Sequence, residues 1–404
     1  MRLKYPQCNT GITDTSVNQA PSPYNSALNQ TDRIQFLVFD LDGVITSEQK
    51  YWNTARLTVW ELITQPEYLG LTNYFGPTQP QQVLVSGQQT INNDFIYELK
   101  RRAINSNWDL TYFVFCLHLA GILRQLQQRE PQKWSGLNPE IDLANSEQWQ
   151  LLRQSLQGLT FDPNESAATI AQFWQETTDL KGSAVTEYVR PFYQKHLGIS
   201  LPETHSDLWN LCYQNFQAWY EGRKGFTLPD DETVLDVEQI KAILQTLKDA
   251  DRFTLAIATG RPRNEVIEPL TALGLLSFFD PQRIVTYDEV LAAEDQLNPN
   301  STPIKLGKPH PFVVLKALYV DEDPQLFCTE AFQQQDRVHA VYIGDAASDV
   351  VAAQRSGCIS VGVLTGFTAS RAKSEQVQMF TDLGCDCVIE SIQALPQVLG
   401  IEPT

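Results

Sequence analysis

The sequence predicts an α/β protein with a doubly wound, Rossmann-like parallel-sheet core and a large all-helical insertion. Two observations predict the core. Short apolar runs alternate with helical stretches after residue 228, and a similar apolar run stands alone at 34–39. Such runs, bounded by turn residues, are typical of strands buried on both faces of a parallel sheet. The third observation predicts the insertion, because residues 47–227 are rich in Gln, Trp, Tyr and Leu at helical spacing.

Each element follows from the same patterns. Strands are expected at 34–39, 253–259, 283–287, 338–344, 359–364 and 386–389. Helices of the core are expected at 236–249, 263–274, 311–320, 329–334, 347–356, 370–383 and 391–399. Helices of the insertion are expected at 47–64, 92–129, 145–157, 163–178, 183–197 and 205–222, with a loop rich in Pro and Gly at 65–87.

The position of the first strand predicts how the domains are divided. One strand precedes the helical insertion and the others follow it, so a single α/β domain is expected from residues 33–46 and 228–404. Residues 47–227 then form a helical cap. Residues 1–32 are rich in Asn, Thr, Ser, Gln and Pro, which indicates a flexible polar arm.

Composition excludes several classes of function. The 404 residues include 30 Lys and Arg against 48 Asp and Glu, a net charge of −18, which argues against nucleic-acid and membrane partners. No apolar stretch is long enough to span a bilayer, and the first residues lack the apolar region of a secretory signal. Seven cysteines at irregular spacing do not form a disulfide pattern, so a cytoplasmic, reduced protein is expected.

Polar residues follow three of the predicted strands at their carboxyl ends. They are Asp40 and Asp42 after the first strand, Thr259 and Gly260 after the second, and Asp345 with Asp349 after the fourth; Lys308 lies in a Pro-stiffened loop. Ligands of open parallel sheets bind at this edge, so these side chains are expected to meet. Several carboxylates that close together repel one another unless a cation joins them, and oxygen ligands favour Mg²⁺. Taken singly, each motif also suits a plain turn or a helix N-cap.

Together, the motifs resemble those of the haloacid dehalogenase superfamily. They are residues 39–44 (FDLDGV), 258–261 (ATGR), 307–309 (GKP) and 344–349 (GDAASD). The resemblance implies that Asp40 is a nucleophile that forms an aspartyl-phosphate and that Asp42 is the general acid and base. It also implies that Asp40, Asp42 and Asp345 hold Mg²⁺, with Asp349 as a further or water-mediated ligand. Thr259, Gly260 and Lys308 would bind the phosphoryl group.

The expected function is therefore Mg²⁺-dependent hydrolysis of a small-molecule phosphate ester. A carboxylate at position 42 favours phosphoryl transfer over dehalogenation, which has no alcohol to protonate. A phosphomutase with the same aspartate chemistry and a catalytically retired binding protein are the alternatives.

Some features stay open. Arg261 either contacts substrate or starts a helix. The basic cluster 100–102 (KRR) is either a solvated helix face or, like Arg190 or Arg223 with Lys224, a group that faces the site. The substrate, the residues that set specificity and the oligomeric state are not determined.

Overall fold

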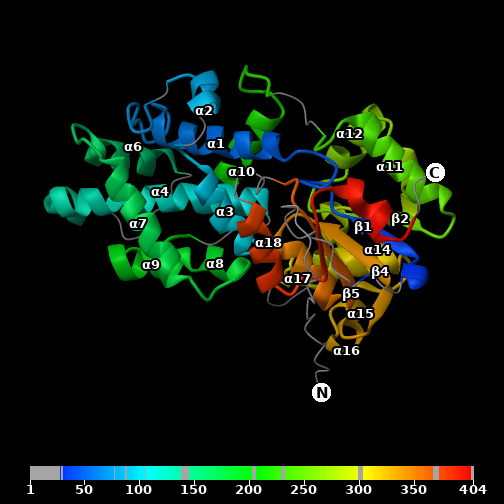
Figure 1. The fold of residues 1–404 in the computed structure, drawn as a ribbon. Coiled ribbons are helices and arrows are strands. Elements are labelled where there is room, and N and C mark those ends of the chain that lie inside the picture. Colours follow the sequence, from blue (N-terminus) through cyan, green and yellow to red (C-terminus); the bar gives the residue numbers. More distant parts are fainter. Residues whose placement is uncertain are drawn as a thin grey trace, which may run out of the picture.

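The structure, a computed structural model, describes residues 28, 31–76, 78–86, 89–104, 106–137, 145–202, 206–228, 233–298, 304–366 and 373–401. The arm predicted at 1–32 therefore lies outside the described residues, apart from Leu28, Thr31 and Asp32. A helical part occupies one side of the molecule and a sheet with its flanking helices occupies the other (Figure 1).

Six parallel strands form one sheet; four lie within a predicted apolar run, and the other two begin one residue before theirs. They are β1 (Phe36–Phe39), β2 (Thr254–Ala258), β3 (Ile284–Val285), β4 (Arg337–Gly344), β5 (Cys358–Val363) and β6 (Cys387–Ile389). The order is β3-β2-β1-β4-β5-β6, so β1 is central although it comes first in the sequence. At its end, Phe39 is in register with Ile257 of β2 and Ile343 of β4.

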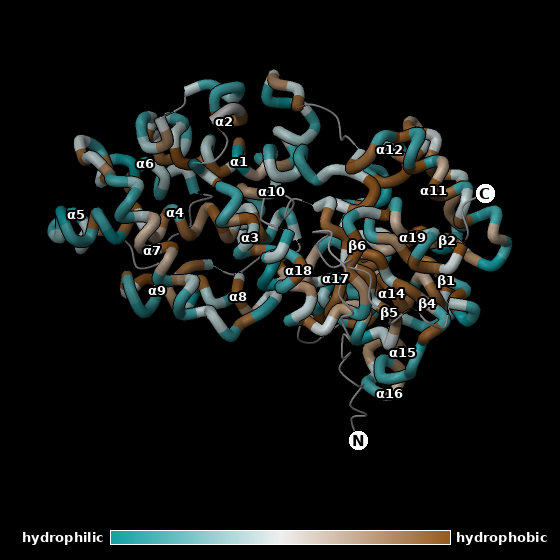
Figure 2. The backbone as a smooth tube through the Cα atoms, viewed as in Figure 1, coloured by the Kyte–Doolittle hydropathy of each residue, from teal (hydrophilic) through white to brown (hydrophobic). Residues whose placement is uncertain are grey.

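Helices cover both faces of the sheet, which confirms the doubly wound fold. Alternate residues of β1 explain why: Leu37 and Phe39 belong to one apolar cluster and Val38 to another. The first cluster includes α11 (Val237–Asp249), α12 (Asn264–Ala272) and α19 (Leu395–Val398). The second includes α13 (Tyr287–Leu297), α14 (Phe312–Leu318), α15 (Pro324–Phe327) and α17 (Ala347–Arg355). The strands are drawn mainly in the hydrophobic colour (Figure 2), and α16 (Glu330–Gln333) and α18 (Lys373–Asp382) complete the set.

The helical segment comprises the ten helices between β1 and α11. They are α1 (Gln49–Thr64), α2 (Pro80–Ser86), α3 (Asn93–Arg101), α4 (Asn107–Arg129), α5 (Pro131–Ser135), α6 (Ser146–Leu156), α7 (Pro163–Glu176), α8 (Ser183–Glu187), α9 (Val189–Leu197) and α10 (Asp207–Tyr220). A single apolar cluster of its own, running from Tyr51 to Leu228, holds the segment together. Helix α4 is central to it and contacts α1, α7, α9 and α10.

The one helix expected at 92–129 is in fact two. Ala103 adopts a left-handed backbone conformation (φ 59°), which ends α3, and the Ser106 hydroxyl accepts the Asp109 N–H to begin α4. Similarly, α8 and α9 divide the range 183–197, α2 lies within the expected loop 65–87, and α13 was not predicted. The break after α3 matters for the site, because it places the end of α3 against the sheet. None of the described helices is both long and apolar enough to cross a membrane.

Candidate active site

The loop after β1 is shaped by a glycine that no other residue could replace. Gly43 has a φ of 72°, and a Cβ built on it would lie 2.5 Å from Oδ2 of Asp345. Its N–H donates to the Thr46 carbonyl at 2.7 Å, which closes the turn. The turn therefore brings the Asp40–Asp42 segment directly against the end of β4.

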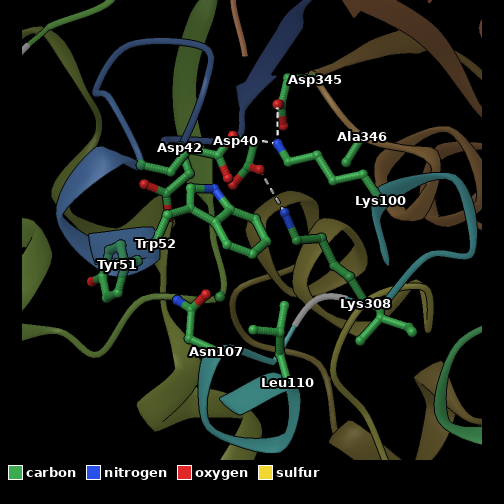
Figure 3. A pocket seen from close by; sticks show the side chains of 13 residues that line it. Asp40, Asp42, Tyr51, Trp52, Lys100, Asn107, Leu110, Lys308, Asp345 and Ala346 are labelled. Carbon is green, nitrogen blue, oxygen red and sulfur yellow. Dashed lines mark hydrogen bonds and ion pairs between the residues drawn. The ribbon is translucent and has the colours of Figure 1, made fainter. Parts of the chain in front are cut away.

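Three of the predicted carboxylates converge at this point. Asp40, Asp345 and Asp349 each offer an oxygen, and these oxygens all lie within 4.8 Å of one another. All three residues are buried, at 4%, 2% and 2% exposure. The expected meeting of the strand ends is thus what the structure shows for these three residues, and Figure 3 shows two of them, Asp40 and Asp345.

Lys308 links the first carboxylate to the third. Its ammonium lies 2.8 Å from Oδ2 of Asp40 and 2.7 Å from Oδ1 of Asp349. The other oxygen of Asp349 accepts the Ala346 N–H at 3.0 Å, at the start of α17. Both oxygens of Asp349 are thus engaged by protein groups, which suits a residue that orients Lys308 more than one that binds a metal directly.

The pKa shifts show that burial makes the charged form of these carboxylates costly. Burial raises the pKa of Asp40 to about 7, against the opposing effect of Lys308 and with a further upward effect of Asp349 and Asp42. Burial also raises the pKa of Asp345 well above its ordinary value, although Lys100 opposes this rise. A cation added to the cluster would relieve this penalty.

The residues present fit a divalent metal ion. Among the described residues, Oδ1 of Asp40 has no hydrogen-bond partner although it is buried. The cavity beside it is lined by four carboxylates, from Asp40, Asp42, Glu48 and Asp345, but by only two ammonium groups, from Lys100 and Lys308. Hard oxygen ligands with an excess of two negative charges match the preference of Mg²⁺.

Asp42 is held by a residue whose role the sequence left open. The Arg261 guanidinium donates from Nε to Oδ1 of Asp42 at 2.9 Å and also bonds the Ser47 carbonyl. The centre of the Tyr51 ring, on α1, lies 4.8 Å from Cζ of Arg261. The Tyr51 hydroxyl donates a hydrogen bond to the Glu265 carboxylate. Arg261 is therefore neither a plain helix-start residue nor a solvent-exposed group, since its side chain is fully buried.

The basic cluster of the helical segment divides between two environments. Lys100 at the end of α3 is buried and contacts Asp345 and Glu48, so the solvated-face interpretation is wrong for it. Arg102 is also buried and donates to the Trp174 and Thr177 carbonyls. Sequence periodicity could not reveal this, because the burial of Lys100 depends on the contact between α3 and α17.

The remaining predicted residues differ in their relation to a small cavity beside the carboxylates. Gly260 lines it, while Thr259 is fully buried and its hydroxyl accepts the Arg261 N–H at 3.4 Å. The helical segment supplies the other wall through Trp52 and Leu110 (Figure 3) and through Ile104. Arg190 and Lys224 contact groups within the helical segment instead, namely the Leu201 carbonyl and Glu61.

Comparison with known proteins agrees with this site. Residues 165–363 match the family of haloacid dehalogenase-like hydrolases. A phosphoglycolate phosphatase of Neisseria meningitidis is 25% identical over 166 residues, which are 41% of this chain and 55% of that protein. An imidazoleglycerol-phosphate dehydratase of Phytophthora nicotianae is 29% identical over 163 residues, 40% of this chain and 29% of that protein. The chain thus matches only part of the length of either relative.

A solved structure extends the similarity over nearly the whole chain. A crystal structure from the Northeast Structural Genomics Consortium is similar with a TM-score of 0.60 and 27% identity, covering 91% of this chain and 98% of that one. The family match over residues 165–363 and the converging carboxylates agree in showing that this chain is similar to the haloacid dehalogenase-like hydrolases.

Proposed function

We propose that the protein is a Mg²⁺-dependent phosphatase that hydrolyses a small phosphomonoester through an aspartyl-phosphate on Asp40. The observation that carries the proposal is the state of Asp40. One of its oxygens is held by Lys308, while the other is buried and without a hydrogen-bond partner among the described residues. A buried carboxylate oxygen without a partner suits attack on phosphorus or binding of a metal ion.

The reaction then needs two proton movements. An Asp40 oxygen attacks phosphorus while Asp42 gives its proton to the departing alcohol oxygen. Asp42 next takes a proton from water, whose oxygen attacks the phosphorus, and free phosphate leaves with Asp40 restored. Arg261 holds Asp42 in place for both movements.

The charges of the transferring group need compensation as well. Asp40, Asp345 and the backbone carbonyl of Asp42 would hold Mg²⁺, with Asp349 orienting its surroundings. The ion would offset the repulsion between these carboxylates and the phosphoryl oxygens. Lys308 would donate to those oxygens together with Thr259 and the backbone at Gly260, which is electrostatic stabilisation of the transition state.

The helical segment is proposed to act as a cap. The assignment divides the chain into a core of residues 33–46 and 228–404 and a cap of residues 47–227. It is supported by the separate apolar cluster of the helical segment and by the walls that Trp52, Ile104 and Leu110 give to the cavity. An enclosed cavity favours a small soluble phosphate ester over a protein or nucleic-acid substrate, and exclusion of water is what such a lid provides.

A substrate panel tests the function. Purified protein with Mg²⁺ is expected to release phosphate from p-nitrophenyl phosphate or from a metabolite such as 2-phosphoglycolate or imidazoleglycerol phosphate, the compounds after which the relatives are named. Asp40→Asn is expected to lower the rate by roughly 10³-fold or more, since no covalent intermediate forms. Asp32→Asn is the matched control, because this carboxylate also lies close to β1 in sequence, on its N-terminal side, but is fully exposed.

Three outcomes would contradict the proposal. Undiminished turnover by the Asp40→Asn variant would exclude the nucleophile. Formation of an isomeric phosphate without release of free phosphate would instead identify a phosphomutase. No turnover across the panel, with no binding of millimolar Mg²⁺, would favour a protein that has lost catalysis.

A further inference from the structure

Lys100 is a cation that the helical segment inserts into the carboxylate site. It lies at the end of α3, far in sequence from every motif of the sheet, and its side chain reaches Asp345 (Figure 3). Its ammonium is 2.5 Å from Oδ2 of Asp345 and also pairs with Glu48, and only 6% of the side chain is exposed. The contact thus joins the helical segment directly to a proposed metal ligand.

Lys100 and a divalent ion both require the charge of Asp345. A buried ammonium needs an anionic partner, and Asp345 supplies it in this arrangement. A metal ion bound by Asp345 would face the ammonium at close range, and two like charges in a buried site repel each other. The lining of the cavity explains why the ammonium is present nevertheless, because its four carboxylates exceed its two ammonium groups even with Lys100 in place.

An oxyanion in the cavity would provide Lys100 with a new partner. The ammonium lines the same cavity as Asp40, Gly260 and Lys308, the groups assigned to the phosphoryl site. The cavity is small, with a volume of about 40 Å³. Any oxyanion bound in it therefore lies close to all the groups that line it. Once a metal ion holds Asp345, Glu48 remains beside the ammonium, and a phosphoryl group in the cavity is a second anion within its reach.

We propose that Lys100 competes with Mg²⁺ for Asp345 and, when displaced by the ion, binds the oxyanion of the substrate. This inference rests on the proposed function and assigns to the helical segment a substrate-binding residue outside the four motifs. Metal, substrate and the end of α3 are then linked. The ion displaces the Lys100 ammonium from Asp345, and the ammonium then donates a hydrogen bond to an oxygen of the phosphoryl group.

Two binding measurements on Lys100→Met test the inference without turnover. The first is Mg²⁺ affinity in the absence of substrate, by calorimetry and by the fluorescence of Trp52, which lines the cavity. Removal of the competing ammonium is expected to tighten Mg²⁺ binding about tenfold, a typical coupling between linked ligands. The second is the affinity for inorganic phosphate at saturating Mg²⁺, which is expected to weaken about tenfold because one ammonium donor is lost.

Lys100→Gln is measured in parallel, so that the test does not depend on how well the Met variant folds, and circular dichroism compares both with the wild type. Lys133→Met, at an exposed position on α5, is the matched control and is expected to change neither affinity.

The opposite signs of the two effects separate this role from others. Mg²⁺ affinity that is unchanged or weaker in both Lys100 variants would overturn the competition, because it would mean that Lys100 is inert or helps to orient Asp345 for the ion. Phosphate affinity that is unchanged would overturn the substrate contact. If either of these contradicting results is obtained while the wild-type protein hydrolyses phosphate esters with Mg²⁺, this inference fails and the proposed function stands. If the wild type neither binds Mg²⁺ nor hydrolyses any ester, both fail.

Discussion

The helical segment and the sheet differ in the partners of their buried polar side chains. In the helical segment the main chain satisfies several of them, although Glu61 pairs with Lys224 and Nδ1 of His118 has no hydrogen-bond partner among the described residues. Arg56 donates to the Ile91 carbonyl, Gln125 to the Asp162 carbonyl, and His118 lies 2.7 Å from the Thr90 carbonyl. At the ends of the strands, by contrast, buried carboxylates meet ammonium groups, and Oδ1 of Asp40 has no hydrogen-bond partner among the described residues.

This difference separates structural polar groups from functional ones. A carbonyl partner stabilises a buried donor permanently, so nothing further is needed there. A carboxylate cluster with excess charge and an unsatisfied oxygen is costly in the isolated chain and becomes favourable only when a ligand arrives. To tell a functional site from a structural one, the number of charges in a region is therefore less useful than whether the partners of those charges belong to the chain.

The largest expected effect comes from the cation that serves the carboxylates. Lys308→Met removes the partner of both Asp40 and Asp349, and breaking a buried pair in this way costs about 3–5 kcal/mol of unfolding free energy. The turnover number is expected to fall roughly 10²–10³-fold, the loss typical of one donor to the transition state. Urea unfolding and steady-state kinetics measure the two effects.

Lys305→Met is the control for this variant. Lys305 lies three residues earlier, is half-exposed and is 3.9 Å from Glu294, so its removal is expected to change stability by less than about 0.5 kcal/mol. Equal losses in the two variants would show that the strand-end charges are ordinary surface pairs.

A core substitution in the helical segment should affect stability without affecting metal binding. Phe113 is fully buried on α4 and its ring packs 5.3 Å from that of Phe173. Phe113→Ala is expected to lower the free energy of unfolding by about 3–5 kcal/mol through the cavity it leaves. Mg²⁺ affinity, by calorimetry below the unfolding transition, is expected to stay at the wild-type value.

Leu151→Ala, at a position 58% exposed on α6, controls for loss of an apolar side chain at the surface. A parallel loss of Mg²⁺ affinity in Phe113→Ala would mean that the two regions are not energetically separate.

The smallest expected effect is a pair of opposite pH dependences in metal-free protein. Burial lowers the pKa of His118 from 6.5 to about 4, so the unfolded chain binds a proton first and stability falls as pH drops from 6.5 toward 4. Burial raises the pKa of Asp40 to about 7, so the folded chain keeps a proton longer, and this contribution to stability is lost as pH rises from about 4 to 7. Each contribution is worth on the order of 3–4 kcal/mol, and because the two act over the same pH range with opposite signs they largely cancel in the wild type. In urea unfolding between about pH 4 and 7, His118→Phe should therefore make stability fall as pH rises, and Asp40→Asn should make it rise; the reverse pairing contradicts the assignment.

Most of the sheet could be predicted from the sequence, because buried parallel strands are continuous apolar runs, and each predicted run overlaps one of β1 to β6. The meeting of Asp40, Asp345 and Asp349 could be predicted as well, since it follows from strand ends that share one edge. The ends of helices were harder to place. The break at Ala103 depends on one left-handed residue, and helical periodicity continues across it.

The contacts of Lys100 and Arg261 could not be predicted for a different reason. Arg261 reaches Asp42 and lies against Tyr51 of α1, and Lys100 reaches Asp345, so both contacts join segments more than 200 residues apart. No local pattern encodes which side chain crosses between the two regions. The basic cluster at residues 100–102 indicated only that charge was concentrated there.

The central place of β1 has a consequence for synthesis of the chain. Both neighbours of β1 in the sheet, β2 and β4, are translated after the whole helical segment, more than 200 residues later. At a ribosomal rate of roughly 5–20 residues per second, this apolar strand waits on the order of 10–40 s for its first partner. The nascent helices can meanwhile assemble around their own apolar cluster, so the sheet is the last part of the fold to form and β1 stays unpaired until then.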